Sequence, residues 1–458
     1  MKEFTSTFDG FNNGLRPTED VAKNTETLIY ARNMKPVVGG MVSVTEPKLI
    51  PGVTTTWPLP QLFKTQAGLI IASHIALDML NPDDTITPLI SGIFPGDWWD
   101  MADYMDYVVA TNGSRMVIYN PVTNVWEVYV GPNFPRVGTL CDFNGQLIMG
   151  DLPTTWSAGT DENWIAWSRI GSADARLDDA GNVAGLAPMR WDGPVLKVMK
   201  LGQHVMVYGA MGISNLMPQK DAPGGWGVPQ RNLFDFGIAT RRCVTGDHRE
   251  HYFLDTSGHL WRITDNHAIT SFGYREFFAP MLGTDIVMSF DPIRREVRIC
   301  NHETGYILTP QGLGGPLDVV ISDTVYDDSR RGLVVGIPQE YTYDQASVII
   351  EPQDIGIREI KNTGWINVTQ KGGSKAEVGV DFKFDKEVAA FQSTVWEETN
   401  PENAGFVRQA GTDVRIKAKF TDFDPLTEEV LISKLAYAIQ SPDRRFHRGA
   451  RGGRGEKI

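Results

Sequence analysis

Short runs of apolar and aromatic residues, separated by Gly, Asn or Asp turns, recur about every 45 residues along much of the chain. In 107–119 and in 250–263, an apolar strand leads through such a turn into a second strand. Serial hairpins with this period are typical of a β-propeller, a disc of small sheets arranged around an axis. No stretch shows the 3.6-residue period of an amphipathic helix. The pattern therefore predicts an all-β fold.

The hairpin pattern extends from about residue 53 to residue 323, a length that divides into six units of about 45 residues. We therefore predict a six-bladed β-propeller within 53–343. The second unit is the clearest, because the turns Asn112-Gly113 and Asn120-Pro121 separate its strands. The third unit carries a polar insertion from Gly171 to Gly185, which we predict to be a loop on one face of the disc.

The pattern changes on both sides of the predicted propeller. Residues 1–52 are polar at first and predict an extended N-terminal arm, up to about Thr27, followed by a hairpin. After 343 the alternation of apolar and polar residues runs over longer stretches. This predicts a small C-terminal antiparallel β domain, similar to a sandwich, over 344–440. The last segment, 441–458, is a basic Arg/Gly tail.

The composition fits a globular chain of two or three domains, with 458 residues of which 41% are hydrophobic and 22% charged. Nowhere do 18 consecutive apolar residues occur, so the sequence predicts no membrane-spanning segment, and its start lacks the apolar run of a secretory signal. The three cysteines, Cys141, Cys243 and Cys300, are far apart and odd in number. We interpret them as buried thiols of a protein made in a reducing compartment.

The formal net charge of −13 argues against general nucleic-acid binding, which needs clustered Lys and Arg. The tail is the exception, because its six cationic and two acidic residues give it a net charge of +4 and leave the body near −17. Such a segment is typical of peptides that contact nucleic-acid backbones, but it could equally contact an acidic neighbouring subunit or only aid solubility. The candidate contact residues are Arg444, Arg445, Arg448, Arg451 and Arg454.

Histidines beside carboxylates make the segment 247–251 the best candidate for a metal site, because imidazole and carboxylate are the ligands that zinc uses. His248 and His251 lie here, and His259 follows. The spacing differs from that of a metallopeptidase helix, which needs histidines four residues apart. In a strand, His248 and His251 also point to opposite faces. We therefore interpret these histidines as turn and surface residues.

Four aspartates, Asp97, Asp100, Asp103 and Asp106, are the best candidates for paired catalytic acids, since glycosidases need two carboxylates and propellers host such enzymes. In a strand, however, a spacing of three residues alternates between the two faces. The aspartates also precede the strands of a blade, where turns favour them. We therefore interpret them as a solvated turn cluster.

No other motif indicates an enzyme. The Gly-rich segments 223–227 and 312–316 match neither a phosphate-binding loop nor a dinucleotide-binding fingerprint, and we interpret both as loops. No Gly-x-Ser-x-Gly nucleophile elbow is present. Tryptophans are expected mainly to fill the wedges between blades, while Trp98, Trp99 and Trp226 are candidates for a partner surface. The sequence thus assigns no catalytic residue, no cofactor and no metal ligand.

Three segments, Ala31-Arg32-Asn33-Met34, Gly39-Gly40-Met41-Val42-Ser43-Val44 and Leu49-Ile50-Pro51-Gly52-Val53, precede the first predicted blade. This order of an Asn-Met pair, a short hairpin and a Pro-Gly-Val turn resembles the opening of the tail nozzle proteins of short-tailed bacteriophages, also called packaged-DNA stabilisation proteins. The stretch Trp167-Ser168-Arg169-Ile170-Gly171-Ser172-Ala173-Asp174 resembles the third-blade region of this family. The layout of arm, propeller and C-terminal β domain is similar too, whereas the basic tail has no counterpart.

The resemblance implies a structural virion protein and no enzyme. Six copies would form a ring, the tail nozzle, below the portal complex and the adaptor ring that connects head to tail. This homo-hexamer would retain packaged DNA and let the double strand pass without sequence specificity during ejection. Tail fibre, spike or needle proteins are further partners that the resemblance implies. The protein would be part of the virion tail, assembled in the host bacterial cytoplasm, which fits the unpaired cysteines.

The charge of the body agrees with this role, because an acidic wall repels phosphates and lets a duplex slide. A ring also needs head-to-tail contacts between copies, and we hypothesise that residues 1–27 and the insertion 171–185 supply them. Two other classes stay open. One is a carbohydrate-active or glycan-binding β-propeller with carboxylates that converge at its hub. The other is a monomeric adhesion or scaffold module.

Overall fold

The computed structural model consists almost entirely of β-strands, and its described residues include one short α-helix, α1 (Arg275–Phe278). The chain forms two compact units, one of Pro47–Glu303 with Val320–Glu340 and the other of Met1–Glu46, Thr304–Val319 and Tyr341–Ile458. None of the helices in the described part of the chain has the length and apolar character that a membrane crossing requires. The structure describes residues 3–15, 27–44, 48–49, 60–73, 76–92, 98–128, 137–152, 162–172, 183–219, 225–228, 232–318, 320–327, 333–340, 345–351, 361–372, 374–384, 390–423 and 428–440.

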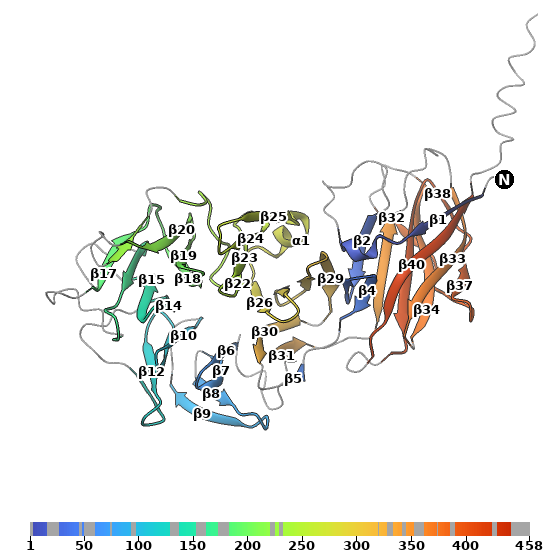
Figure 1. Ribbon diagram of the computed structural model, residues 1–458. Coiled ribbons are helices and arrows are strands. Elements are labelled where there is room, and N and C mark those ends of the chain that lie inside the picture. Colours follow the sequence, from blue (N-terminus) through green and yellow to red (C-terminus); the bar gives the residue numbers. More distant parts are fainter. Residues whose placement is uncertain are drawn as a thin grey trace, which may run out of the picture. The chain divides into compact units, whose positions relative to one another are not determined.

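The first unit, hereafter the propeller unit, contains five antiparallel sheets of four strands that follow one another along the chain (Figure 1). Their strands are β6 (Gln61–Thr65), β7 (Gly68–Ala72), β8 (Ala76–Leu80) and β9 (Ile86–Ser91); β10 (Asp100–Tyr104), β11 (Tyr107–Thr111), β12 (Met116–Asn120) and β13 (Val125–Val128); β14 (Thr139–Phe143), β15 (Gln146–Gly150), β16 (Trp164–Trp167) and β17 (Gly185–Pro188); β18 (Val195–Leu201), β19 (His204–Gly209), β20 (Ile213–Pro218) and β21 (Trp226–Gly227); and β22 (Val244–Gly246), β23 (Glu250–Leu254), β24 (Leu260–Thr264) and β25 (Ile269–Gly273).

Two further elements complete a ring. They are the hairpin of β26 (Val287–Asp291) and β27 (Glu296–Cys300), and a sheet of β30 (Val320–Asp327), β31 (Leu333–Glu340) and β5 (Lys48–Leu49), in which β5 pairs parallel to β31. We call the strand of each element that comes first in it, β6, β10, β14, β18, β22, β26 or β30, its first strand. These first strands contact one another in the order β26, β30, β6, β10, β14 and β18, and β22 contacts β26. Apolar side chains of the β18 and β22 sheets share one core cluster. This is the arrangement of a β-propeller.

The six blades predicted from the sequence are not confirmed, because seven first strands stand in this ring among the described residues. The additional sheet joins β5, which lies before the predicted propeller start at 53, to β30 and β31, which reach beyond 323. Dividing residues 53–323 into equal units therefore leaves β5 and β31 outside the count, so this sheet was not recognised as a separate unit. The unit length also varies, since successive first strands begin at 61, 100 and 139, but the next begins only at 195.

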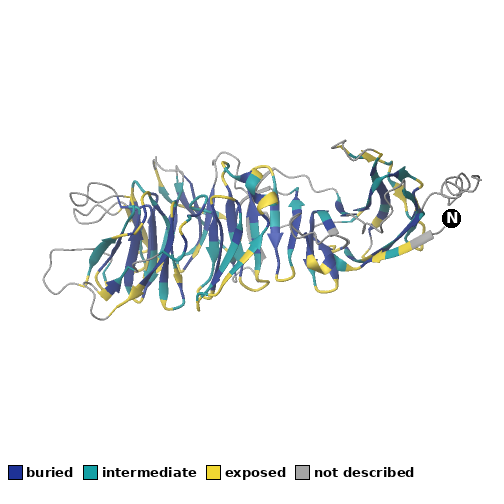
Figure 2. Cartoon of the chain, turned by 90° about the horizontal axis from the view of Figure 1, so that it is seen from above, coloured by how far each residue is buried: buried dark blue, intermediate teal, exposed yellow. Residues whose placement is uncertain are grey.

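Apolar side chains fill the wedges between neighbouring sheets, and Figure 2 shows buried residues concentrated in the strands and exposed residues at the turns. Trp99 and Trp126 lie in the cluster between the first two sheets. Trp167, Trp191 and Trp226 lie in the cluster of the third and fourth sheets. The prediction that tryptophans fill these wedges is therefore confirmed for these five. Trp99 and Trp226 are 5% exposed, so neither belongs to a partner surface of the isolated unit.

The second unit, hereafter the sandwich unit, is built from two sheets. In one, β3 (Met34–Val37), β4 (Gly40–Ser43), β40 (Leu431–Gln440), β33 (Lys361–Lys371) and β37 (Ala404–Phe406) stand in this order, with β1 (Glu3–Phe8) on β40 and β38 (Ala410–Gly411) on β33. The other contains β28 (Gly305–Leu308), β29 (Leu313–Leu317), β2 (Thr27–Arg32), β32 (Ala346–Glu351), β39 (Asp413–Thr421), β34 (Lys375–Lys383) and β35 (Gln392–Ser393), with β36 (Glu397–Glu398) on β34.

The C-terminal β domain predicted over 344–440 thus also includes strands from the first 44 residues and from 305–317. The segment 312–316, which we predicted to be a loop, mostly belongs to strand β29. Its glycines allow a close backbone approach rather than a turn. A Cβ atom on Gly314 would stand 2.3 Å from the carbonyl oxygen of Met34. The other Gly-rich segment, 223–227, lies partly outside the described residues.

Where the structure describes the predicted N-terminal arm, the segment belongs to the sandwich unit instead of projecting from it. Strand β1 pairs with β40 from Glu3 opposite Gln440 to Phe8 opposite Leu435. A short 3₁₀ helix, η1 (Gly10–Asn13), follows, and its Phe11 is fully buried with its ring centroid 4.7 Å from that of Phe8. These apolar residues anchor the segment. Residues 16–26, most of the insertion 171–185 (173–182) and the tail 441–458 lie outside the described residues.

The short hairpin predicted after Asn33-Met34 is confirmed as β3 and β4, which pair from Met34 opposite Ser43 to Val37 opposite Gly40. Gly40 adopts a φ of 159° and lies against β40, where a Cβ atom would come within 2.1 Å of the carbonyl oxygen of Ile432. No larger residue fits there without moving a strand. Gly39, by contrast, faces open space.

We expect Phe11→Ala to destabilise the sandwich unit by about 3–5 kcal/mol, because it removes a fully buried ring from its core. Differential scanning calorimetry of the full chain measures this as a lower melting temperature. Thr7→Ala is the matched control, since Thr7 is an exposed residue of the same segment and its loss should change little. Equal melting temperatures for Phe11→Ala and the unsubstituted chain would show that residues 3–15 do not belong to the folded unit.

Candidate functional site

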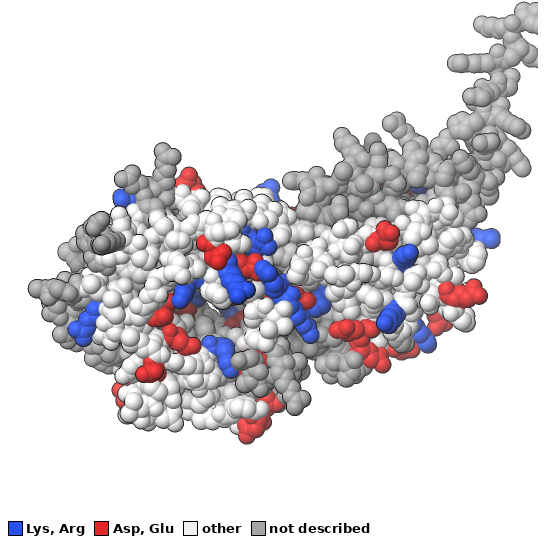
Figure 3. Space-filling model, viewed as in Figure 1, with Lys and Arg blue, Asp and Glu red and all other residues white. Residues whose placement is uncertain are grey.

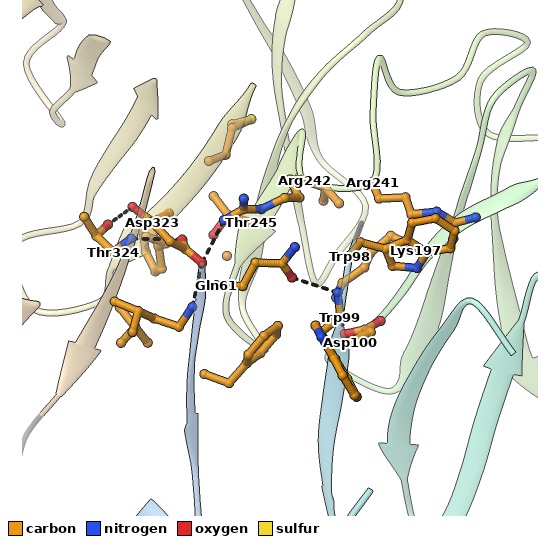
Figure 4. Close-up of a pocket in the computed structure, with 18 of the residues that line it drawn as sticks. Gln61, Trp98, Trp99, Asp100, Lys197, Arg241, Arg242, Thr245, Asp323 and Thr324 are labelled. Atoms are coloured by element: carbon orange, nitrogen blue, oxygen red, sulfur yellow. Dashed lines mark hydrogen bonds and ion pairs between the residues drawn. The ribbon is translucent and has the colours of Figure 1, made fainter. Parts of the chain in front are cut away.

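The hub of the propeller unit, where the first strands meet, is the candidate functional site (Figure 4). At four junctions, a polar side chain of one first strand accepts a hydrogen bond from a backbone N–H in or just before the next first strand of the ring. These hydrogen bonds join Leu62 N to Asp323 Oδ2 at 2.9 Å, Trp99 N to Gln61 Oε1 at 2.8 Å, Leu140 N to Asp100 Oδ2 at 3.1 Å and Val198 N to Thr139 Oγ1 at 3.0 Å. We call this set the hub ties.

Ion pairs reinforce the hub ties. Lys197 Nζ lies 2.5 Å from Asp100 Oδ1, and Arg242 Nη2 lies 2.8 Å from Asp323 Oδ2. Both pairs join sheets that are not neighbours along the chain. The Asp100 side chain is only 4% exposed and also accepts the Thr139 hydroxyl at 2.5 Å. Such a buried carboxylate is stable because cations and hydrogen-bond donors surround it.

Trp98 and Arg241 form a second part of the hub. The Arg241 guanidinium carbon stands 4.2 Å from the Trp98 ring centroid, a cation–π contact. Trp98 Nε1 donates to the carbonyl of Gly138 at 3.0 Å. Arg241 also forms an ion pair with Asp151 and donates to the carbonyl of Leu196 at 3.2 Å. Trp98 therefore contacts the hub and holds Arg241 in place.

A cavity of about 260 Å³ lies among these side chains. Typical ligand pockets measure about 300–1,000 Å³, so this cavity is small. Its two carboxylates, Asp100 and Asp323, each have a cationic partner from another sheet. Burial raises the pKa of Asp323, and the nearby Arg242 opposes this rise. The carboxylates of the hub thus form ion pairs and hydrogen bonds with residues of other sheets. Such an arrangement joins the sheets and differs from a free acid and base that face a substrate.

The structure separates the four aspartates that we interpreted as a solvated turn cluster. Asp103 and Asp106 are exposed, whereas Asp97 lies outside the described residues. The interpretation is wrong for Asp100, which is 3% exposed and begins strand β10.

The sequence does contain a signal for this hub position. Polar residues recur three positions apart at corresponding places in other first strands, as Gln61 and Lys64, Asp100 and Asp103, Thr139 and Asp142, and Lys197 and Lys200. Comparing the units with one another, rather than reading one unit alone, would have identified it.

The candidate metal segment also separates. His248 is exposed in the turn before β23, and His259 lies beside Asp255, with Nδ1 3.3 Å from the carboxylate. His251 is fully buried, and its ring nitrogens lie 2.8 Å from the Tyr208 hydroxyl and 3.1 Å from the carbonyl of Lys200. The surface interpretation is therefore wrong for His251. Burial lowers its pKa to about 4, so it is a neutral core residue.

The remaining candidates divide in the same way. Cys243 and Cys300 are buried thiols, as predicted, while Cys141 is half-buried, and none of the three forms a disulfide. Burial raises the pKa of Cys243 to about 11, which makes its thiol unreactive at neutral pH. The tail candidates Arg444, Arg445, Arg448, Arg451 and Arg454 lie outside the described residues.

No protein-family model matches this sequence, and no curated protein matches it. Among solved structures, it is similar to the extracellular domain of a one component system from B. thetaiotaomicron, with 11% identity, a TM-score of 0.41, and coverage of 83% of this chain and 55% of that chain. It is also similar to PorZ, a surface component of the type-IX secretion system of Porphyromonas gingivalis, with 9% identity, a TM-score of 0.38, and coverage of 71% and 44%. BamB from Moraxella catarrhalis has 11% identity and a TM-score of 0.36, with coverage of 66% and 98%. This chain spans about half the length of the first two, and none of these similarities bears on function.

We expect the propeller unit to lose stability as the pH falls from 6.5 towards 4. An unfolded histidine has a pKa of about 6.5, so in this interval the unfolded chain binds a proton at position 251. The buried His251 of the folded chain does not bind it, and the unfolded state is therefore favoured as the pH falls. His251 alone then contributes a loss of up to about 3 kcal/mol. Urea unfolding followed by tryptophan fluorescence measures it, because ten of the twelve tryptophans belong to this unit.

Carboxylates also titrate near pH 4 and contribute to the loss of stability. Comparing the pH dependence of unfolding in His251→Gln and His302→Gln separates the contribution of His251 from theirs. The first variant should show a shallower loss of stability between pH 6.5 and 4.5, whereas the second, which removes an exposed histidine, should follow the unsubstituted chain. Parallel curves for all three proteins would contradict the buried, neutral state of His251.

Proposed function

We propose that this chain is a structural subunit of the tail nozzle of a short-tailed bacteriophage. In this proposal, six copies form a ring below the portal and adaptor, retain the packaged DNA, and provide the channel for its ejection. The observation that carries the proposal is the chemistry of the hub. In the described residues, the charged side chains at the centre of the propeller bind to other sheets, so they serve rigidity.

The residues that carry the family resemblance also support a structural role. Asn33 adopts a left-handed φ of 56° and is fully buried. Its side chain donates to Asp318 at 2.5 Å and accepts the backbone N–H of the same residue at 2.7 Å. Arg32 Nε contacts both Asp318 carboxylate oxygens, at 2.8 and 2.9 Å. The Asn-Met motif thus fixes the start of the β3–β4 hairpin within the sandwich unit.

Charge and size limit where DNA would pass. A hub cavity of about 260 Å³ is too small to admit a duplex, so a DNA channel requires a ring of subunits. The acidic body, near −17 without the tail, would keep phosphates from adhering to such a channel. Acidic and basic side chains are interspersed on the face of the propeller unit shown in Figure 3. The acidic wall expected from the net charge would therefore have to lie elsewhere on the ring.

The hypothesis that residues 1–27 contact neighbouring copies stays a prediction, but deleting this segment would not test it. Residues 3–15 contribute a strand and buried aromatic rings to the sandwich unit, so deleting them would damage the fold and could not test assembly alone. Contacts between copies are better sought on the surface of the folded units. The basic tail remains a candidate for contact with DNA or with an acidic neighbouring copy.

We expect the purified chain, mixed with its cognate portal and adaptor proteins, to form sixfold rings attached to the adaptor. Negative-stain electron microscopy and mass photometry test this, with an added mass of six 50.9-kDa subunits. The adaptor and the chain, each measured alone, are the controls. A single subunit-sized species under all conditions, without attachment, would contradict the proposal. Release of sugar from a polysaccharide would instead favour a carbohydrate-active propeller.

A further inference from the structure

Two histidines from neighbouring sheets meet at one end of the propeller unit. His204 begins strand β19, and His267 lies in the turn between β24 and β25. Their ring centroids are 4.7 Å apart, and the ring planes are inclined by 33°. Neither residue belongs to the 247–259 segment that the sequence singled out, because only the packing of two sheets brings them together.

Backbone hydrogen bonds lock together the turns that carry these histidines. Gly202 N donates to the carbonyl of His248 at 2.7 Å, and Asp265 N donates to the carbonyl of Arg249 at 2.9 Å. The turn before β23 therefore clamps the other two turns. Gly202 also approaches Asp265 so closely that a Cβ atom on it would lie 3.0 Å from the Asp265 Cβ. The two imidazoles are held in place by the scaffold rather than by one another.

The turn of His267 is itself tightly specified. Ala268 N donates to the Asn266 side chain at 3.1 Å, and His267 N donates to the carbonyl of Thr264 at 2.8 Å. His267 has a φ of 61°, a left-handed conformation that costs a residue other than glycine about 1 kcal/mol or more. The turn thus keeps a histidine where asparagine or glycine would be less strained.

Each of the two rings has a buried nitrogen atom without a hydrogen-bond partner, His204 Nδ1 and His267 Nε2. Leaving a buried polar atom unsatisfied typically costs about 1–3 kcal/mol. An imidazole nitrogen that makes no hydrogen bond can bind a ligand instead. Neutral imidazole is the form that binds metal ions.

We propose that His204 and His267 together bind a divalent transition-metal ion, of the class of Zn²⁺, Ni²⁺ or Cu²⁺, between the fourth and fifth sheets. Imidazole nitrogens suit these ions, whereas Mg²⁺ and Ca²⁺ prefer oxygen ligands. Within the described residues, no group of three His, Cys, Asp or Glu side chains gathers around an ion. Water therefore completes the coordination shell, as it does in open metal sites.

Bound metal would link two sheets that otherwise meet through apolar packing and hydrogen bonds. Because the ion binds the folded chain, it should raise the melting temperature, and the rise should grow with the concentration of free ion. The test uses the untagged full-length chain, freed of metal with a chelator and titrated with ZnCl₂ or NiCl₂ by calorimetry. We expect one ion per chain, and no binding of MgCl₂.

Three variants make this test specific. His204→Gln and His267→Gln should each weaken Zn²⁺ binding at least about tenfold, which corresponds to the loss of about 1.4 kcal/mol. His302→Gln, which removes an exposed histidine of another turn, should leave the affinity unchanged. Far-UV circular dichroism without metal confirms that each variant is folded. Absence of binding by the unsubstituted chain would overturn the proposal, and so would an affinity of either the His204 or the His267 variant equal to that of the unsubstituted chain.

A spectroscopic measurement is independent of changes in stability. The electron paramagnetic resonance spectrum of one equivalent of Cu²⁺ bound to the chain should show two imidazole nitrogen ligands. His267→Gln should reduce them to one or abolish the bound signal. A spectrum that is the same in the variant and in the unsubstituted chain would place the ion elsewhere and contradict the site.

Discussion

The propeller unit depends on closing a ring of first strands whose edges do not form a continuous sheet. Each small sheet ends at the hub, and backbone N–H groups there need partners that neighbouring strands do not supply as a ladder. The hub ties meet this need, with Asp323, Gln61, Asp100 and Thr139 each accepting an N–H from the next strand. Apolar wedges add area between sheets, and at these four junctions the ties fix how one sheet is placed next to its neighbour.

The same side chains explain why the hub offers little to a substrate. Asp100 and Asp323 accept several donors each, and the cations that balance them come from other sheets. Removing one partner would leave a buried charge, so these groups cannot easily exchange a proton or a ligand. A stiff disc is what a ring-shaped conduit requires of its subunits. It is for this reason that the proposed structural role and the hub chemistry agree.

The sequence was informative where structure is local. Turn residues and period-two alternation identified the strands of the second sheet, the hairpin at 34–43 and the all-β class, because these depend on neighbours within about ten residues. The additional sheet of β30, β31 and β5 was missed because it pairs residues 48–49 with residues 333–340, which lie far apart along the chain. Residues 3–15 resembled an arm because their partner strand, β40, lies near the other end of the chain.

The candidate site was less predictable for the same reason. Asp100 resembles any turn aspartate until the polar positions of several first strands are compared with one another. His251 gave no sign of burial, since the residues that enclose it, Tyr208 and Lys200, belong to another sheet. The His204 and His267 pair has no sequence spacing that could reveal it. Contacts between sheets decide all three cases.

Hydrogen–deuterium exchange of Thr139→Val tests the central claim most directly, because it removes one hub tie with little change in side-chain volume. If the ties hold the ring together, amides of β18 should exchange faster in the variant, since Val198 N loses its acceptor. Amides of the outer strand β13 should keep their rates. Unchanged protection of β18 would contradict the claim and leave apolar packing as the interaction that closes the ring.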